Sequence, residues 1–405
     1  MMRKLASSIF LLAWCGMPVA AFAQQPEVTV DVSVGGSVST NPFLYADKGT
    51  AAAGNVGVRP LILWQDEVGQ TAIEGDLRLA QYTNRYGTDL SGRIGVSSNR
   101  RLDEKTTLSL SSSYQSLRSA IQNNFLLAGQ DPLNPSNDPI PVIPPVDTTI
   151  AGIRSRTQAA SGSVGVAHVI DEVSSINAGV SLGASFVNDD IGFDYRNLSG
   201  HIGYERRFSE RFALTATVQG GTVNYLGRGT GDSRIFTPQL GIRQQLTSRL
   251  IFVAGAGVSY VLTDVGTGKD AKRTSFSGNV GLCDRGQDQT FCLSASRSAQ
   301  PTALGGVSSV TAVAANFDVV LSQKDRVSFA ARYGRTDQNG NSGLPTQFRA
   351  TDIIGVSGTY SRRLNDRMTF TVTPSYSKIY GDTQGRRGSN ASLMVGVTVR
   401  FGKLG

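Results

Sequence analysis

Apolar and polar residues alternate along most of this chain. Met368 and Phe370 fall on one side of a predicted strand, and Thr369 and Thr371 fall on the other. This follows because successive side chains of a β-strand point to opposite faces. The alternation recurs over nearly the whole sequence and predicts about 18 strands, within a range of roughly 16 to 18, since single-chain bacterial barrels have even strand numbers.

One short phrase recurs between the alternating segments. Each copy has a long apolar or aromatic residue, then two or three polar residues, and then a new strand. The copies lie at 99–105, 205–211, 243–249 and 361–367. A unit repeated in this way along a strand-rich chain is typical of the short periplasmic turns of an outer-membrane β-barrel.

The connections on the opposite side are longer. They cover residues 41–54, 120–156, 264–272, 300–307 and 336–350. Short periplasmic turns and long external loops are the known asymmetry of such barrels. An even number of strands then places the N- and C-termini on the periplasmic side.

The loop at 122–155 is rich in proline, with Pro139, Pro141, Pro144 and Pro145 close together. Proline lacks the N–H that a strand ladder needs, so this segment is not predicted as strand. Two arrangements stay open. The loop either folds inward and constricts the pore, or stands outside as a partly extended polyproline segment.

These patterns predict an all-β fold: a transmembrane antiparallel up-and-down β-barrel without a plug domain. Residues 1–23 have the charged, apolar and small-residue regions of a signal peptide, which leaves 24–405 for the barrel. No later run of about 18 apolar residues predicts a membrane-spanning helix. A secreted soluble β-sandwich or β-helix is the alternative fold.

The alternation also assigns strand faces, because lipid requires apolar side chains outside and a hydrated lumen accepts polar ones. The residues predicted to face the lumen are Arg59, Glu74, Asp76, Arg78, Arg93, Asn197, His201, Glu205, Gln239, Arg243, Arg332 and Arg400. A wall with both charge signs indicates a hydrated interior, although part of this set could instead form salt bridges that brace the wall.

Aromatic residues near the predicted strand ends are expected at the two membrane interfaces, where aromatic girdles form. They are Trp64, Phe208, Phe212, Tyr225, Tyr260 and Tyr380. The last strand adds an assembly signal, because 396–401 resembles the C-terminal segment that the barrel-assembly machinery reads. Its key residues are Gly396, Val399 and Phe401, although four further residues follow Phe401.

The cysteines and the net charge give little indication of a chemical activity. Cys283 and Cys292 flank one turn, where an oxidising compartment permits a disulfide; two free thiols are the alternative. The net charge of +8 does not imply nucleic acid in an exported chain. It could favour anionic solutes or acidic lipid head groups, and a solvated surface of mixed charge is the alternative. With only two histidines, no catalytic constellation, metal site or cofactor is expected.

Part of the chain resembles a family of outer-membrane β-barrel porins associated with exopolysaccharide export operons. The resemblance lies in 34–44, with its Thr-Asn-x-Phe loop, and in 58–61, 81–82, 86–89 and 100–103. The sequence differs from the family at Asn41, where an Asp-Asn pair is more usual. The resemblance implies a passive route for secreted polysaccharide, with a periplasmic polysaccharide export protein as partner.

The leading hypothesis is therefore a channel in the outer membrane of a Gram-negative cell, serving export of an exopolysaccharide. A passive diffusion porin for small solutes is the first alternative. A structural or adhesive barrel, whose proline-rich loop contacts an external partner, is the second. Besides polysaccharide and its export protein, the expected partners are outer-membrane lipid and the barrel-assembly machinery.

Overall fold

A computed structural model describes residues 25–45, 49–83, 86–118, 148, 156–188, 193–227, 231–264, 270–303, 305–337, 350–381 and 388–402. The predicted signal peptide lies outside the described residues, as does the loop at 122–155 apart from Thr148. The strands are β1 (Glu27–Ser39), β2 (Ala51–Asp66), β3 (Gly69–Tyr82), β4 (Thr88–Arg101), β5 (Thr106–Leu117), β6 (Thr157–Val169), β7 (Ser174–Val187), β8 (Tyr195–Ser209), β9 (Phe212–Tyr225), β10 (Ser233–Gln245), β11 (Leu250–Asp264), β12 (Asp270–Arg285), β13 (Gln289–Pro301), β14 (Val307–Val320), β15 (Asp325–Asp337), β16 (Ala350–Arg363), β17 (Met368–Gly381) and β18 (Ser389–Gly402).

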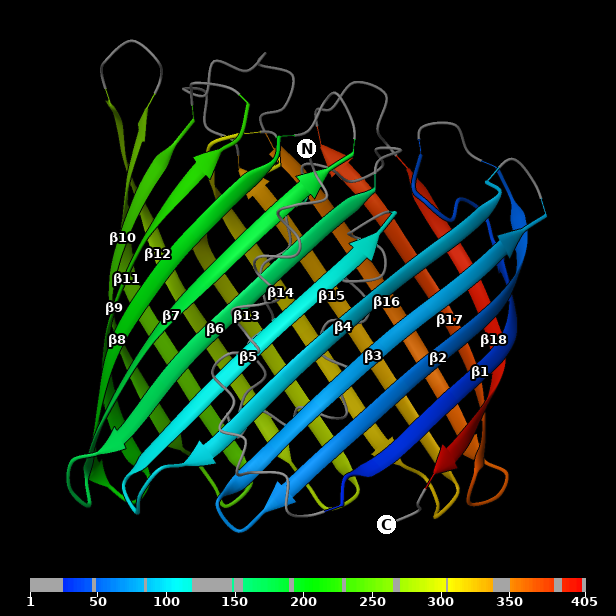
Figure 1. Ribbon diagram of the computed structural model, residues 1–405, viewed down its shortest axis with the longest axis horizontal. Coiled ribbons are helices and arrows are strands. Elements are labelled where there is room, and N and C mark those ends of the chain that lie inside the picture. Colours follow the sequence, from blue (N-terminus) through cyan, green and yellow to red (C-terminus); the bar gives the residue numbers. More distant parts are fainter. Residues whose placement is uncertain are drawn as a thin grey trace.

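The strands form one 18-stranded antiparallel sheet that closes on itself (Figure 1). Each strand pairs with its neighbours in the sequence, and β1 pairs with both β2 and β18. This confirms the predicted up-and-down barrel at the upper end of its expected strand range. No helix among the described residues is long and apolar enough to cross a membrane.

The recurrent turn phrase has one structural explanation. Its first polar residue accepts a hydrogen bond from the backbone N–H two positions later, as Asp103 does from Lys105 at 2.7 Å and Asn365 does from Arg367 at 2.9 Å. Ser209 and Thr247 make the same contact in the other copies. Asp, Asn, Ser and Thr are favoured in turns for this local bond.

The two rims of the barrel differ. The turn end holds these short connections, the start of β1 and the end of β18, and the loop end holds the other connections (Figure 1). Several strands run further toward the loop end than the sequence predicted. The expected loop at 300–307 is an example, because β13 continues to Pro301 and β14 begins at Val307.

Contacts between distant strands identify the inner face. The Tyr225 hydroxyl on β9 lies 3.0 Å from the carbonyl oxygen of Thr302, although β10, β11 and β12 separate β9 from β13. Such a contact is possible only through the interior. Tyr225 was therefore wrongly assigned to an interfacial girdle, because it is buried inside. Phe208, Tyr260 and Tyr380 fall on the outer face and are exposed.

The register then divides each strand into an inner and an outer set, because directly paired residues share a face. Large apolar residues lie exposed on the outer face of every part of the sheet. They include Val34, Leu77, Ile94, Leu198, Phe236, Leu240, Phe276, Phe329 and Leu393. Cys283 and Cys292 pair directly across β12 and β13 on the inner face and form a disulfide.

Closure of the barrel depends on two glycines. Gly35 of β1 and Gly396 of β18 pair directly, and a Cβ atom on Gly35 would collide with the carbonyl oxygen of Val395. Val399 and Phe401, two residues of the suggested assembly signal, lie on the outer face of β18. The signal's third residue, Gly396, lies on the inner face.

Candidate functional site: the inner wall

The structure places all twelve predicted lumen residues on the inner face. The chain of paired residues is continuous: Asp31 pairs with Arg59 and Arg400, and Asp76 pairs with Arg93. The inner sets of β8 and β10 follow through the intervening strands. A one-residue shift in the pairing of a strand would move all its side chains to the opposite face. The placement of these residues therefore depends on the whole set of strand pairings.

A group of ion pairs covers the inner face from β18 through β4. Arg400 binds Asp31 through two nitrogen–oxygen contacts of 2.7 and 2.8 Å. Asp76 accepts from Arg78 Nε at 2.8 Å and lies 3.7 Å from Arg59 Nε. These arginines stay in contact with water; the Arg59 and Arg400 side chains are 54% and 53% exposed. We call this surface the open wall.

Further ion pairs lie within the open wall and on the strands across the lumen from it. Arg93 lies 3.4 Å from Glu74, and on the far strands Arg243 lies 3.7 Å from Glu205. Such exposed ion pairs contribute little stability, typically below about 1 kcal/mol each. The predicted wall-bracing role is therefore present in geometry, yet the arrangement leaves both charge signs available to the lumen.

Some predicted lumen residues lie along the wall rather than projecting from it. Asn197 and His201 each occupy the space beside a glycine of β7, Gly183 and Gly179 respectively, where a Cβ atom would meet their side chains. Gln239 donates to Ser277 at 2.6 Å. These contacts flatten polar groups against the sheet and widen the passage in front of them.

Hydroxyl pairs line further parts of the inner face. Ser111 and Ser163 lie 2.7 Å apart, and Ser375 and Ser392 lie 2.6 Å apart, each pair directly opposite in register. Serine hydroxyls both donate and accept, so these pairs satisfy each other and still bind water. The inner face is thus a hydrated polar surface with few strongly held charges.

The connection between β1 and β2 folds inside the mouth of the barrel. Asn41 holds it: its amide nitrogen donates to the Tyr45 carbonyl at 2.8 Å, and its amide oxygen accepts from the Tyr45 N–H at 3.1 Å. The backbone N–H of Asn41 donates to Asn390 of β18 at 3.0 Å. Leu44 has φ of 57°, a left-handed conformation that bulky residues rarely adopt. The Thr-Asn-x-Phe segment is therefore a fixed part of the wall.

An aromatic cluster packs this connection against β3. The Phe43 ring lies 5.4 Å from the Tyr82 ring and 5.7 Å from the Tyr86 ring, measured between centroids. The Arg118 guanidinium stands 5.3 Å from the Phe43 centroid, a cation–π distance. Phe43, Tyr45 and Tyr86 are buried, so their faces are not available for stacking on a solute.

The tip of the β13–β14 hairpin also lies inside. Besides its contact with Thr302, the Tyr225 hydroxyl donates to the Gly306 carbonyl at 2.6 Å. The N–H of Phe193, between β7 and β8, donates to the Ala303 carbonyl at 2.7 Å. The tip thus crosses part of the mouth and is bound at its far side by two groups, the Tyr225 hydroxyl and the Phe193 N–H.

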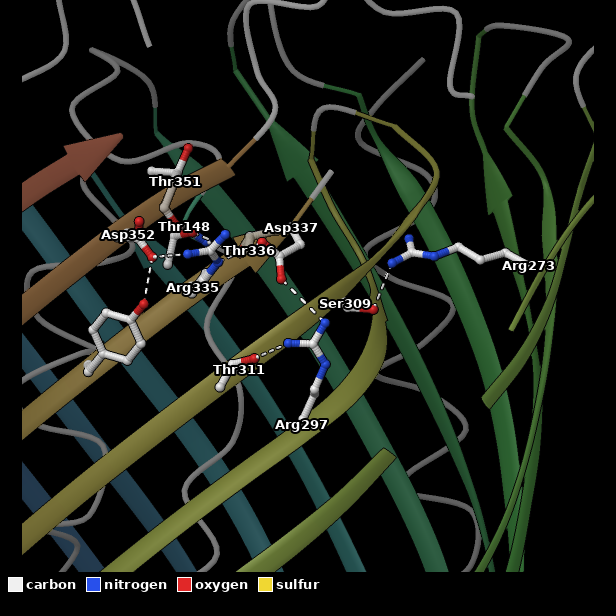
Figure 2. A network of polar contacts seen from close by, with 11 residues as sticks. Thr148, Arg273, Arg297, Ser309, Thr311, Arg335, Thr336, Asp337, Thr351 and Asp352 are labelled. Atoms are coloured by element: carbon white, nitrogen blue, oxygen red, sulfur yellow. Dashed lines mark hydrogen bonds and ion pairs between the residues drawn. The ribbon is translucent and has the colours of Figure 1, made fainter. Parts of the chain in front are cut away.

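Figure 2 shows how the hairpin leaves the wall. Arg273 on the inner face of β12 donates to Ser309, which belongs to the outer set of β14, at 2.9 Å. This contact requires the loop-end part of β14 to lie on the lumen side of β12. Outer-set ion pairs then join β13 to β15, because Arg297 and Arg335 both bind Asp337, at 3.3 and 2.6 Å.

Thr148 lies in the middle of the long connection between β5 and β6, against the inner face of β15 and β16 (Figure 2). Its hydroxyl lies 2.8 Å from Thr336 Oγ1 and 2.8 Å from the Thr351 carbonyl oxygen. Thr148 is fully buried. At this residue the connection reaches the inside of the barrel; the rest of 122–155 lies outside the described residues.

The inner face from β14 to β18 is covered at its loop half. Inner-set residues Val310, Thr336, Ile353, Ile379 and Asn390 are all buried. We call this surface the covered wall. Inner-set residues near the loop end of other strands are buried as well, among them Ala53, Ser91 and Val223, so the mouth is narrowed on more than one side. The arginines of the open wall contact water.

Arg332 lies on the covered wall and differs from the other predicted arginines. It is 3% exposed, and its three guanidinium nitrogens have no hydrogen-bond partner among the described residues. Its direct neighbours in register are Ala314 and Gly355. The alternation predicted its face correctly but gave no sign of its burial.

Sequence reasoning missed several residues of the lumen. Asp31 was not singled out, although its odd position between Val30 and Val32 places it on the inner face opposite Arg400. The covered wall was missed too. The sequence feature that could have indicated it is the adjacent apolar pair Ile353 and Ile354, which gives β16 apolar residues on both faces.

The two histidines lie apart from each other. The described residues contain no group of three or more His, Cys, Asp or Glu side chains able to hold a metal ion. His168 lies at the turn end, 2.9 Å from the Thr106 hydroxyl, and His201 lies against Gly179. The chemistry that the inner face offers is weak, reversible contact with polar and charged groups.

No protein-family model and no curated protein matches this chain. Solved structures that it resembles include OccK2 (OpdF) of Pseudomonas aeruginosa in complex with glucuronate, with TM-score 0.46 and 11% identity over 94% of this chain and 99% of that one. Another is OccK7 (OpdD) of the same organism, with TM-score 0.44 and 10% identity over 95% and 100%. The FrpB iron transporter of Neisseria meningitidis has TM-score 0.43 and 8% identity over 93% and 83%. Similarity at this level carries no information about the solute.

Proposed function

We propose that this protein is an outer-membrane channel through which small polar solutes diffuse passively. One observation carries the proposal: a closed barrel has a hydrated inner wall of exposed ion pairs, and folded segments narrow its loop end. Contacts on such a wall are weak and numerous, which suits passage better than tight binding.

The outer face supports a membrane location. Exposed apolar side chains surround the barrel, and soluble monomers rarely expose apolar surface so continuously. Bacterial barrels of this kind have short periplasmic turns, so the turn end and both termini lie in the periplasm on this proposal. Outer-membrane lipid and the barrel-assembly machinery are the corresponding partners.

The folded segments at the loop end favour small solutes. The 40–45 connection, the β13–β14 tip and Thr148 each bind the inner face, and each occupies part of the mouth. The exopolysaccharide export role, with polysaccharide and a periplasmic export protein as partners, was the leading hypothesis from the sequence. It rests on the family resemblance alone and gains no support from the fold or the comparisons.

Conductance in a planar lipid bilayer tests the proposal. The full-length protein, purified from outer membranes, should give stepwise conductance in KCl, and vesicles containing it should swell in small sugars faster than in oligosaccharides. Closed bilayers from correctly folded protein would contradict the proposal. Weighing secreted and cell-retained polysaccharide in a deletion strain tests export separately; loss of the secreted fraction would restore that hypothesis.

A further inference from the structure

Three exposed cations lie on the outer face at the loop end of alternate strands. Arg196 is the second residue of β8, Arg234 is the second residue of β10, and Lys272 is the third residue of β12. Each lies on the same strand face as an apolar residue of the outer set, because an even number of positions separates the two. These apolar residues are Leu198, Phe236 and Phe276. We call the three cations the cation row.

The register fixes the spacing of the cation row. Arg234 and Lys272 both pair with Leu262 of β11, so two strand spacings, about 10 Å, separate their backbones. Arg196 and Arg234 both pair with β9, at positions two residues apart, which places them about 12 Å from each other. The cation row therefore extends over roughly 20 Å of the outer face.

The charges of the cation row are not balanced by ion pairs. None of the three side chains has a carboxylate oxygen within 4 Å in the described part of the chain. Outer-face arginines on other strands differ in this respect, because Arg297 and Arg335 both bind Asp337. The cation row is thus exposed and available to an anion from outside the chain.

The carboxylates near the cation row lie closer to the loop end. Asp194 and Asp232 precede β8 and β10, and each already accepts a backbone N–H, from β7 at 2.9 Å and from β9 at 2.8 Å. Asp264 and Asp270 pair with each other at the loop-end limit of β11 and β12. An anion that approaches from the turn-end side along the outer face therefore meets the cations before the carboxylates.

Apolar side chains lie directly below the cation row, toward the turn end. Phe236 and Tyr260 are about half exposed, with ring centroids 6.5 Å apart, and Phe276 is 59% exposed. Arginine and lysine at such a border extend their charged ends beyond the apolar surface. On β1 and β4 the apolar outer face instead continues to Val38 and Leu90, close to the loop end, and the described outer face carries no cation there.

On the proposed function the loop end faces the cell exterior, so the cation row lies at the outer leaflet. The lipid of that leaflet in a Gram-negative cell is lipopolysaccharide, a glycolipid with phosphate groups next to its acyl chains. Arginine and lysine bind phosphate through charge-assisted hydrogen bonds. We infer that the cation row binds the phosphates of lipopolysaccharide, while its acyl chains cover the apolar side chains below. This inference rests on the proposed function and adds a lipid site to it.

Competition among lipids tests the site. The full-length barrel in a non-ionic detergent is titrated against a fluorescently labelled lipopolysaccharide of minimal core, and fluorescence anisotropy reports binding. Unlabelled lipid A with both phosphates should displace the label. Lipid A without phosphates should compete about tenfold less well or worse. Phosphatidylglycerol and inorganic phosphate should also compete weakly, because the first lacks the phosphorylated sugars and the second lacks acyl chains.

Variants assign the binding to the cation row. Arg234→Gln combined with Lys272→Gln should weaken lipopolysaccharide affinity about tenfold or more, because two phosphate ligands are lost. Two matched controls should bind like the wild type. Arg206→Gln changes an exposed cation on the same outer face at the turn end of β8, and Lys378→Gln changes one at the loop end of β17, on another side of the barrel.

The heat-modified gel shift shows which variants fold, and the two single variants carry the test if the double variant does not. Unchanged affinity in the double variant overturns the inference, as does equal weakening in the two controls. Equal competition by dephosphorylated lipid A, by phosphatidylglycerol or by inorganic phosphate also overturns it. Conductance of the wild type in a bilayer free of lipopolysaccharide separates failure of this site from failure of the channel function.

Discussion

The turn residue Asp103 makes the stability of the folded protein depend on pH. Its carboxylate accepts from the N–H groups of Lys105 and Thr106, both at 2.7 Å. These bonds, led by that from Lys105, lower the pKa of Asp103 below its usual value. A lowered folded-state pKa stabilises the folded protein above the unfolded pKa of about 3.9, and this contribution disappears as the pH falls through the folded value.

Asp103→Asn should therefore make the free energy of unfolding less dependent on pH in the acid range. Asparagine keeps one acceptor oxygen for the same turn, as Asn365 shows in another copy of the phrase. Denaturant unfolding between about pH 6 and 3 measures the effect. The wild type should lose more stability than the variant below about pH 4; parallel curves for the two proteins would refute the assignment.

Gly35 is required where the barrel closes. A Cβ atom there would collide with the Val395 carbonyl, whereas at the adjacent Gly36 the nearest atom is 3.8 Å away. Gly35→Ala should destabilise the seam between β1 and β18 by about 1–3 kcal/mol, the usual range for overpacking. Gly36→Ala is the matched control, and the folded fraction on a heat-modified gel is the measurement. Equal folded fractions would show that the seam can relax.

At the scale of elements, the β13–β14 hairpin is held inside by the Tyr225 hydroxyl together with the Phe193 N–H. Tyr225→Phe removes the bonds to Thr302 and Gly306 while keeping the ring and its packing on Tyr195. We expect a stability loss of about 1 kcal/mol and a larger, noisier single-channel conductance, because the tip then keeps only the Phe193–Ala303 bond across the mouth. Tyr260→Phe, on the outer face, controls for loss of a hydroxyl. Unchanged conductance in Tyr225→Phe would mean that the tip does not narrow the passage.

Elements differ in how far the sequence predicts them. Strand faces follow from local alternation, so Arg59, Asp76 and Arg400 could be placed on the inner wall without any knowledge of their partners. Tyr225 could not, because its role depends on a contact 77 positions away. The same holds for Phe43: its ring is buried by a loop that folds back on β3, and no local pattern encodes that return.

At the scale of the whole molecule, the interior changes along the barrel axis from the loop end toward the turn end. Apolar inner residues such as Ile353 and Ile379 are covered, whereas ion pairs on β18 through β4 stay in water. Alternation alone predicts a uniformly polar lumen, since it reports which face a residue occupies and not what covers that face. The passage consequently has a buried, narrowed loop half and an exposed charged surface beyond it, and ions should sense mainly the charged surface.

Asp76 tests whether ions travel along the open wall, because it is the shared partner of Arg59 and Arg78. Asp76→Asn leaves two cations unbalanced on the open wall, so the channel should become more selective for chloride over potassium. Arg78→Gln should shift selectivity the other way, and Arg234→Gln on the outer face should leave it unchanged. Reversal potentials under a tenfold KCl gradient give the permeability ratios. If none of the three variants changes the ratio, ions do not travel along the open wall; if Asp76→Asn and Arg78→Gln shift it in opposite directions, the exposed ion pairs set the field that a solute meets.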